Sequence, residues 1–179
     1  MDKIKIIAFI AFIFHSNLLF ANDFKWKCEG SACTLLATNN FNQTFIISDN
    51  ISPDMKKNIT YKILGDNLGE MTTSCGSPCE YTKIIDFKNE SKSDDFFMAQ
   101  DISIKNGLII SLKKDCLLVS KFFDENKSIC IKRDFSPAVI LPIRSAKFIA
   151  NNQMKIEYAQ GNNYTIITED ITLPSQLRK

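Results

Sequence analysis

Apolar and polar residues alternate in short runs along most of this 179-residue chain, and clusters of turn-forming residues separate the runs. The alternation is clearest at residues 154–158, MKIEY, where three apolar side chains would share one face of a strand and two charged ones the other. The only partial helical period, at residues 113–123, is rich in β-branched and aromatic residues and favours strand. The pattern predicts about eleven to thirteen strands.

These strands are expected to follow one another in consecutive antiparallel meanders, with the spacing typical of a sandwich or barrel. The GDNLGE segment, residues 65–70, is interpreted as a turn between two of them. An alternative is a small propeller-like array of three- to four-stranded sheets, with meanders near residues 24–48, 107–133 and 145–169. No sequence signature repeats among the three. The predicted strands lie within residues 24–48, 61–64, 81–87, 96–104, 107–112, 116–120, 128–133 and 145–169.

Residues 1–21 have the layout of a secretory signal peptide. Two lysines precede an apolar run, residues 6–14, and the segment ends in LLFA at Ala21. Polar residues 15–17 interrupt the apolar stretch, which therefore falls short of the roughly 18 apolar residues that a membrane span needs. We expect cleavage after Ala21, a single all-β domain at residues 22–179, no stable membrane insertion, and a periplasmic or secreted protein. The many Asn, Lys and Ile residues favour a bacterial periplasm.

The chain has six cysteines, all beyond the predicted cleavage site. An even number in an exported chain predicts three disulfides, and six cysteines allow fifteen pairings. Proximity in sequence favours pairs that each close a short loop. The CxxxxC and CxxxC spacings match neither a zinc site nor a thioredoxin-type redox pair. The favoured pairs are Cys28 with Cys33, Cys75 with Cys79, and Cys116 with Cys130.

The third pair restricts the hairpin that carries it. If residues 124–127 formed a tight turn, Cys116 and Cys130 would lie too far apart along the strands, because a disulfide needs Cα atoms within about 7 Å. We therefore expect a wide loop, roughly residues 120–126, with the two cysteines directly opposed. Such a loop also removes Phe122 and Phe123 from regular strand.

Composition excludes several classes of function. The chain has 22 basic and 20 acidic residues, and this balance argues against nucleic-acid binding. Its only histidine, His15, lies in the predicted signal peptide, so the mature chain lacks the imidazole that Ser-His-Asp and Cys-His sites need. Disulfides would also occupy every thiol. We expect no enzymatic activity, no metal and no cofactor.

A carboxylate-dependent hydrolase is the enzymatic alternative, because a glycosidase needs only two carboxyl groups. Every candidate pair lies in a turn or at a strand end, where solvated surface charge is the commoner explanation. The pairs are Asp94 with Asp95, Asp124 with Glu125, and Glu169 with Asp170.

The CGSPC turn is the first candidate binding site. A loop closed by Cys75 and Cys79, with Gly76 permitting unusual dihedrals and Pro78 fixing one, loses little conformational freedom when a partner docks. The alternative is that the bridge only secures the start of the next strand. The candidate residues of the loop are Ser74, Gly76, Ser77 and Pro78.

Two pairs of adjacent phenylalanines, at residues 96–97 and 122–123, are the second candidate. Neighbours on a strand point to opposite faces, so one member of each pair is available to solvent or a partner unless both faces are covered. The candidate aromatic residues are Phe97, Phe122 and Phe123.

Together these observations predict an exported, disulfide-stabilised binding protein that acts through protein–protein contact. Its most concrete form is an inhibitor or immunity protein whose partner is an envelope-degrading enzyme or exported effector. A carboxylate-dependent envelope hydrolase and a structural envelope component are the alternatives.

Overall fold

The computed structural model describes residues 22–65, 67–137 and 141–177, and the predicted signal peptide lies outside them. The described chain is built from four antiparallel sheets, which confirms the all-β prediction. The first sheet contains β1 (Asp23–Glu29), β2 (Ala32–Thr38) and β3 (Thr44–Ile51). The second contains β4 (Ile59–Gly65), β5 (Leu68–Gly76), β6 (Cys79–Asp86) and β7 (Ser91–Lys92), and β8 (Phe96–Phe97) also pairs with β6.

The third sheet contains β9 (Asp101–Ser103), β10 (Leu108–Lys113), β11 (Cys116–Lys121) and β12 (Asp124–Ile131). The fourth contains β13 (Ile143–Ala150), β14 (Gln153–Gln160) and β15 (Thr165–Thr172). The three short 3₁₀ helices are η1 (Pro53–Asn58), η2 (Ile104–Asn106) and η3 (Ser175–Leu177).

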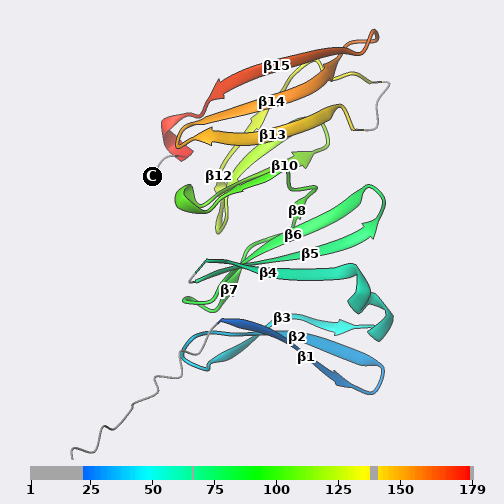
Figure 1. Cartoon of the computed structure of the whole chain (residues 1–179), viewed down its shortest axis with the longest axis vertical. Coiled ribbons are helices and arrows are strands. Elements are labelled where there is room, and N and C mark those ends of the chain that lie inside the picture. The colour runs from blue at the N-terminus through cyan, green and yellow to red at the C-terminus, as the bar shows by residue number, and fades with distance from the viewer. Residues whose placement is uncertain (1–21, 66, 138–140, 178–179) are drawn as a thin grey trace, which may run out of the picture.

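The four sheets lie one above another in a column (Figure 1). Within the described residues they do not close into a barrel, and the arrangement fits a stack of small sheets packed face to face. The meanders predicted near residues 24–48, 107–133 and 145–169 are the first, third and fourth sheets. The second sheet was not predicted as a unit, because Leu68, Gly69 and Glu70 of the supposed turn belong to β5.

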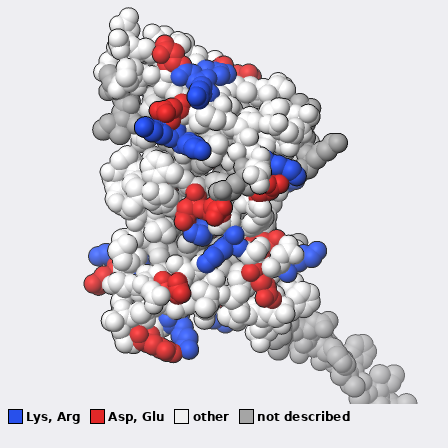
Figure 2. Space-filling model, turned by 180° about the vertical axis from the view of Figure 1, so that it is seen from behind, with Lys and Arg blue, Asp and Glu red and all other residues white. Residues whose placement is uncertain are grey.

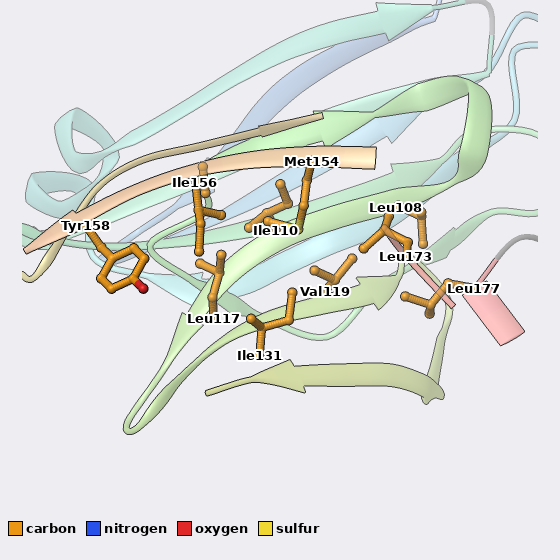
Figure 3. Close-up of a cluster of buried hydrophobic side chains, with 11 residues drawn as sticks. Leu108, Ile110, Leu117, Val119, Ile131, Met154, Ile156, Tyr158, Leu173 and Leu177 are labelled. Atoms are coloured by element: carbon orange, nitrogen blue, oxygen red, sulfur yellow. The ribbon is translucent and has the colours of Figure 1, made fainter. Parts of the chain in front are cut away.

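Each pair of neighbouring sheets encloses its own hydrophobic core. Side chains of the two inner sheets point alternately to the two sides, so Ile84 of β6 faces the third sheet while Ile85 faces the first. The core of the first and second sheets contains Phe24, Leu35, Ala37, Ile47, Met71, Ile85 and Phe87. The middle core contains Ile84, Phe96, Ile109 and Phe122. The core of the third and fourth sheets is the largest; most of its members are drawn in Figure 3, among them Leu108, Leu117, Val119, Met154 and Ile156.

The sheets are stacked in the same orientation, with their first strands on one side of the column. The rings of Phe24 in β1 and Tyr61 in β4 have centroids 4.9 Å apart. Between the third and fourth sheets, the Phe148 N–H of β13 donates to Asp101 Oδ2 of β9 at 2.7 Å. On the opposite side, Arg133, just after β12, pairs with Glu169 of β15. The first strands β1, β4, β9 and β13 therefore form one side of the molecule.

All three predicted disulfides are present. The Cα atoms are 4.0 Å apart for Cys28 and Cys33, which face each other at the end of the β1–β2 hairpin. They are 5.1 Å apart for Cys75 and Cys79. Each bridge joins two residues of the same sheet, so the disulfides fix hairpins and not the contacts between sheets.

The predicted geometry of the third disulfide is wrong in two respects. Leu118, not Cys116, lies opposite Cys130, and the bridge spans the ladder diagonally with a Cα separation of 5.6 Å. The expected wide loop at residues 120–126 is also absent, because Lys121 already pairs with Asp124. A register shift between Ser120 and Lys121 accommodates the extra residues of β12, so a tight turn and the bridge coexist.

Candidate docking surface

The CGSPC turn forms the tip of the β5–β6 hairpin. The segment from Ser74 to Pro78 is exposed, and Gly76 has a φ of 112°, a value that favours glycine. Because the Cys75–Cys79 disulfide closes the base of the turn, the tip is a short, conformationally restricted projection. We call these residues, 74–79, the stapled tip.

Phe97 lies close to the stapled tip. It pairs with Tyr81 across the β6–β8 ladder, and the two ring centroids are 5.3 Å apart. Both side chains are substantially exposed, Phe97 to 37% and Tyr81 to 40%. Since Tyr81 follows Cys79 by two residues in β6, the aromatic pair adjoins the locked turn.

The backbone around Phe97 is held firmly. Met98 has a φ of 47°, a left-handed conformation that is rare for a bulky residue. Its N–H donates to Glu80 O at 2.9 Å, and its carbonyl accepts the Gln100 side-chain amide at 3.1 Å. These bonds stabilise the sharp change of direction that leaves Phe97 exposed while Phe96 enters the middle core.

Two shallow grooves meet at Phe97 and extend toward the third sheet. The larger has a volume of about 310 Å³ and includes Ser111 and Leu118, and the smaller, of about 130 Å³, includes Cys116 and Phe135. Leu112 and Lys113 line both grooves. Phe97 thus lies between the β5–β6 hairpin, which carries the Cys75–Cys79 disulfide, and the β10–β11 hairpin, whose strand β11 is bridged to β12 through Cys116.

Unpaired positive charge borders the smaller groove. Lys113 and Lys114 are exposed, and within the described part of the chain neither makes an ion pair. Lys83, in contrast, pairs with Asp95 at 2.6 Å. The candidate docking surface, defined as the stapled tip, Tyr81, Phe97, Lys113 and Lys114, therefore combines an aromatic centre with free ammonium groups.

The other two candidate aromatic residues are not part of this surface. Phe122 is only 4% exposed and belongs to the middle core, so its interpretation as a contact residue was wrong. Phe123 is 44% exposed, but it lines a separate groove of about 330 Å³ with Leu68 and Ile104. Phe122 and Phe123 occupy a tight turn, where strand alternation does not determine which ring is buried.

Most of the carboxylates considered for hydrolysis take part in ion pairs. Asp95 pairs with Lys83, Asp124 with Lys127, and Asp170 with Lys155. The Arg133 side chain donates to both oxygens of Glu169, and these hydrogen bonds hold the pKa of Glu169 below its usual value. A lowered pKa is unfavourable for a general acid, which must carry a proton near neutral pH.

Adjacent residues Glu169 and Asp170 also lie on opposite faces of β15, because successive strand side chains alternate. The two carboxylates therefore cannot act together on one bond. Among the described residues, no group of three or more His, Cys, Asp or Glu side chains is placed to hold a metal ion.

Sequence analysis missed Tyr81, Lys113 and Lys114 as members of the surface. Tyr81 had an available signal, because it lies two residues after Cys79 and so shares its face of the strand. The two lysines had none, since their proximity to Phe97 depends on the stacking of the second and third sheets.

No family model, curated protein or solved structure matches this chain. None of the helices in the described ranges has the length and hydrophobicity to span a membrane. The three disulfides are typical of proteins that mature in an oxidising compartment.

Proposed function

We propose that this chain is an exported binding protein that acts by docking another protein onto the stapled tip and the Tyr81–Phe97 pair. The observation that carries the proposal is the exposed aromatic pair held beside a disulfide-locked turn. Aromatic anchors supply much of the binding free energy at protein interfaces. A restricted loop also loses little conformational entropy on binding.

The charge of the surface indicates the kind of partner. Among the described residues, neither Lys113 nor Lys114 makes an ion pair, so a complementary partner presents carboxylates around an apolar patch. In its most concrete form, the chain is an inhibitor or immunity protein. Its stapled tip enters a cleft of an envelope-degrading enzyme or exported effector, in the periplasm or outside the cell.

A matched pair of phenylalanine substitutions tests the proposal. Phe97→Ala removes the centre of the docking surface, whereas Phe123→Ala removes a comparably exposed ring from a different groove. Each variant and the unmodified protein would be used for affinity capture from envelope extract and culture fluid of the producing cell, followed by mass spectrometry. We expect a stoichiometric protein that the unmodified chain and Phe123→Ala recover and Phe97→Ala does not.

The captured partner would then be purified and titrated. We expect Phe97→Ala and Ser77→Arg to weaken its binding at least about tenfold, as for a central interface residue, with melting temperatures close to that of the unmodified protein. Recovery of the same partner with equal affinity by all variants would exclude this surface from the interface. A carboxylate substitution that abolished a measured turnover of an envelope polymer would replace the proposal with a hydrolase.

A further inference from the structure

Two polar grooves border the small middle core. One, of about 490 Å³, lies on the β4 side and is lined by threonines and charged side chains. The other is the groove of about 310 Å³ that reaches Phe97, and it is lined by Ser111 of β10, Ser120 of β11 and Ser128 of β12. Its volume falls within the range of roughly 300 to 1,000 Å³ found for small-molecule sites. We call it the serine groove.

The register of the third sheet directs these serines toward the second sheet. Ser111 follows Ile109 by two residues, and Ser120 lies directly opposite Ile109 on the neighbouring strand. Because Ile109 belongs to the middle core, both serines share the face that lines it. Ser128 lies directly opposite Ser120. The three side chains therefore form a triangle, about 5 Å between opposed positions and 7 to 8 Å along a diagonal.

Two of the three serine side chains are buried without a partner in the protein. Ser111 is 1% exposed and Ser120 2% exposed. Within the described ranges, neither hydroxyl makes a hydrogen bond. The buried Ser93 hydroxyl, in contrast, accepts the Ile84 N–H at 2.9 Å and donates to the Asp94 carbonyl at 2.8 Å. A ligand that enters the serine groove with its own polar groups would recover part of the cost of burying unpaired hydroxyls.

Part of the groove wall is apolar. Leu118 lies directly opposite Ser111 on the same face of the third sheet. Phe96 of β8 lines the groove from the side of the middle core. A serine hydroxyl both donates and accepts, so it is complementary to a hydroxyl of a ligand, whereas the apolar wall is complementary to carbon-bound hydrogens. A sugar ring offers both kinds of surface.

The unbalanced charge at the groove is positive. Lys113 follows Ser111 by two residues on the same face, and among the described residues it makes no ion pair. Asp95 also lines the groove, but its carboxylate pairs with Lys83 at 2.6 Å. On the face that Figure 2 shows, acidic and basic side chains are mixed, and neither sign forms a broad patch. We therefore expect a single side chain, Lys113, to determine which charge a ligand of this groove carries.

We propose that the serine groove binds an acidic sugar residue, a pyranose ring that carries a carboxylate. The ring packs against Phe96 and Leu118. Its hydroxyls form hydrogen bonds with Ser111 and Ser120, and its carboxylate pairs with Lys113. Two sources share this chemistry, a single sugar and a residue within an acidic polysaccharide. Although Lys113 also belongs to the docking surface, the inference does not rest on the proposed docking of a protein.

NMR titration of the purified, disulfide-bonded protein tests the groove. The methyl glycosides of glucuronic and galacturonic acid represent the ligand, and those of glucose and galactose are their neutral counterparts. Hexanoate provides a carboxylate without hydroxyls. We expect at least one acidic glycoside to bind, to shift the amides of Ser111 and Ser120, and to lose affinity as salt rises. Tighter binding of trigalacturonate than of any single sugar would identify a polysaccharide as the source.

Serine variants test the hydrogen bonds. Ser111→Ala and Ser120→Ala should each weaken binding of the acidic glycoside by up to about tenfold, the loss expected for one hydrogen bond between neutral groups. Ser145→Ala is the control, because Ser145 lies in β13 of the fourth sheet, and it should bind normally.

Lysine variants test the charge. Lys113→Gln should weaken binding of the acidic glycoside by up to about fivefold, as for an exposed ion pair, and should not affect a neutral glycoside. Lys114→Gln is the matched control, because Lys114 is also exposed but lines only the smaller groove. Ser77→Arg, which tests the docking surface, should bind the acidic glycoside normally. Failure of one proposal would therefore leave the other intact.

Three results would overturn the inference. One is the absence of binding by both acidic glycosides. Another is a neutral glycoside or hexanoate that binds as tightly as the better acidic glycoside, which would assign the groove to a different class of ligand. The third is binding that Ser111→Ala and Ser120→Ala weaken no more than Ser145→Ala.

Discussion

The three spaces between the sheets differ in how they are filled. Between the third and fourth sheets, fully buried residues such as Leu117, Met154 and Ile156 form a continuous core. Between the second and third sheets, the core is small and gives way to a groove lined by threonines and charged side chains. The spaces between similar sheets therefore differ in composition. The outer spaces hold apolar cores that stabilise the fold, whereas the middle space has less apolar contact and more polar surface.

The largest expected contrast is between buried isoleucines of the two spaces. Ile156→Ala, in the core of the fourth sheet, should lower the free energy of unfolding by about 4 kcal/mol, near the upper end for such truncations. Ile84→Ala, in the middle core, should cost only about 2 kcal/mol, because a smaller core beside an open groove relaxes more easily. Denaturant unfolding without reductant measures both. An equal or larger loss for Ile84→Ala would contradict the comparison.

Removal of the disulfides should have the next largest effect. Joint substitution of Cys116 and Cys130 by alanine opens a ring with a sequence separation of 14 and should cost about 3 kcal/mol. The same substitution of Cys75 and Cys79, with a separation of 4, should cost about 2 kcal/mol. Thermal and denaturant unfolding of the two double variants would compare them. A larger loss of stability on removal of the Cys75–Cys79 bridge would show that this bridge also stabilises the packing of the second sheet on the third.

The ion pair between Arg133 and Glu169 should give a smaller, pH-dependent effect. The hydrogen bonds from Arg133 lower the pKa of Glu169 in the folded protein, so the pair stabilises at neutral pH, and this contribution disappears as the pH falls through the lowered pKa. Because both side chains are about one third exposed, the contribution should stay below about 1 kcal/mol. Unfolding of the unmodified protein and Glu169→Gln from pH 7 to pH 3 should show curves that converge. A difference that did not narrow as the pH fell would assign it to another cause.

The smallest expected effect is in the groove itself. Thr82→Val replaces a poorly bonded hydroxyl with a methyl group of similar size, so stability should change by less than about 1 kcal/mol in either direction. Thr38→Val is a useful control, because Thr38 is also buried and its hydroxyl contacts that of Thr44 at 3.2 Å in the first sheet. A loss of several kcal/mol for Thr82→Val would mean that the Thr82 hydroxyl stabilises the fold.

Sequence reasoning succeeded where strand alternation and local pairing decide the structure. The MKIEY run predicted one buried face, and Met154, Ile156 and Tyr158 do form it in an outer sheet. The failure at β5 has a tertiary cause. A Cβ at Gly69 would approach the Phe24 ring to 2.7 Å, so glycine is required by packing, although in the sequence it resembles a turn signal.

The candidate site was only partly accessible to the same reasoning. The stapled tip follows from cysteine spacing, and one ring of residues 96–97 is exposed, as strand alternation allows. The groove was not predicted, because Thr72 and Thr82 look like ordinary strand residues until the third sheet lies opposite them. A groove between two sheets depends on how the sheets are placed relative to each other. The order of residues along one strand does not reveal that placement.

The disulfides all join cysteines that are consecutive along the chain, the first with the second, the third with the fourth and the fifth with the sixth. Correct oxidation can then proceed in chain order, with each hairpin sealed before the next pair of cysteines reacts. An oxidase without proofreading is sufficient for such a chain, and its maturation should not require an isomerase.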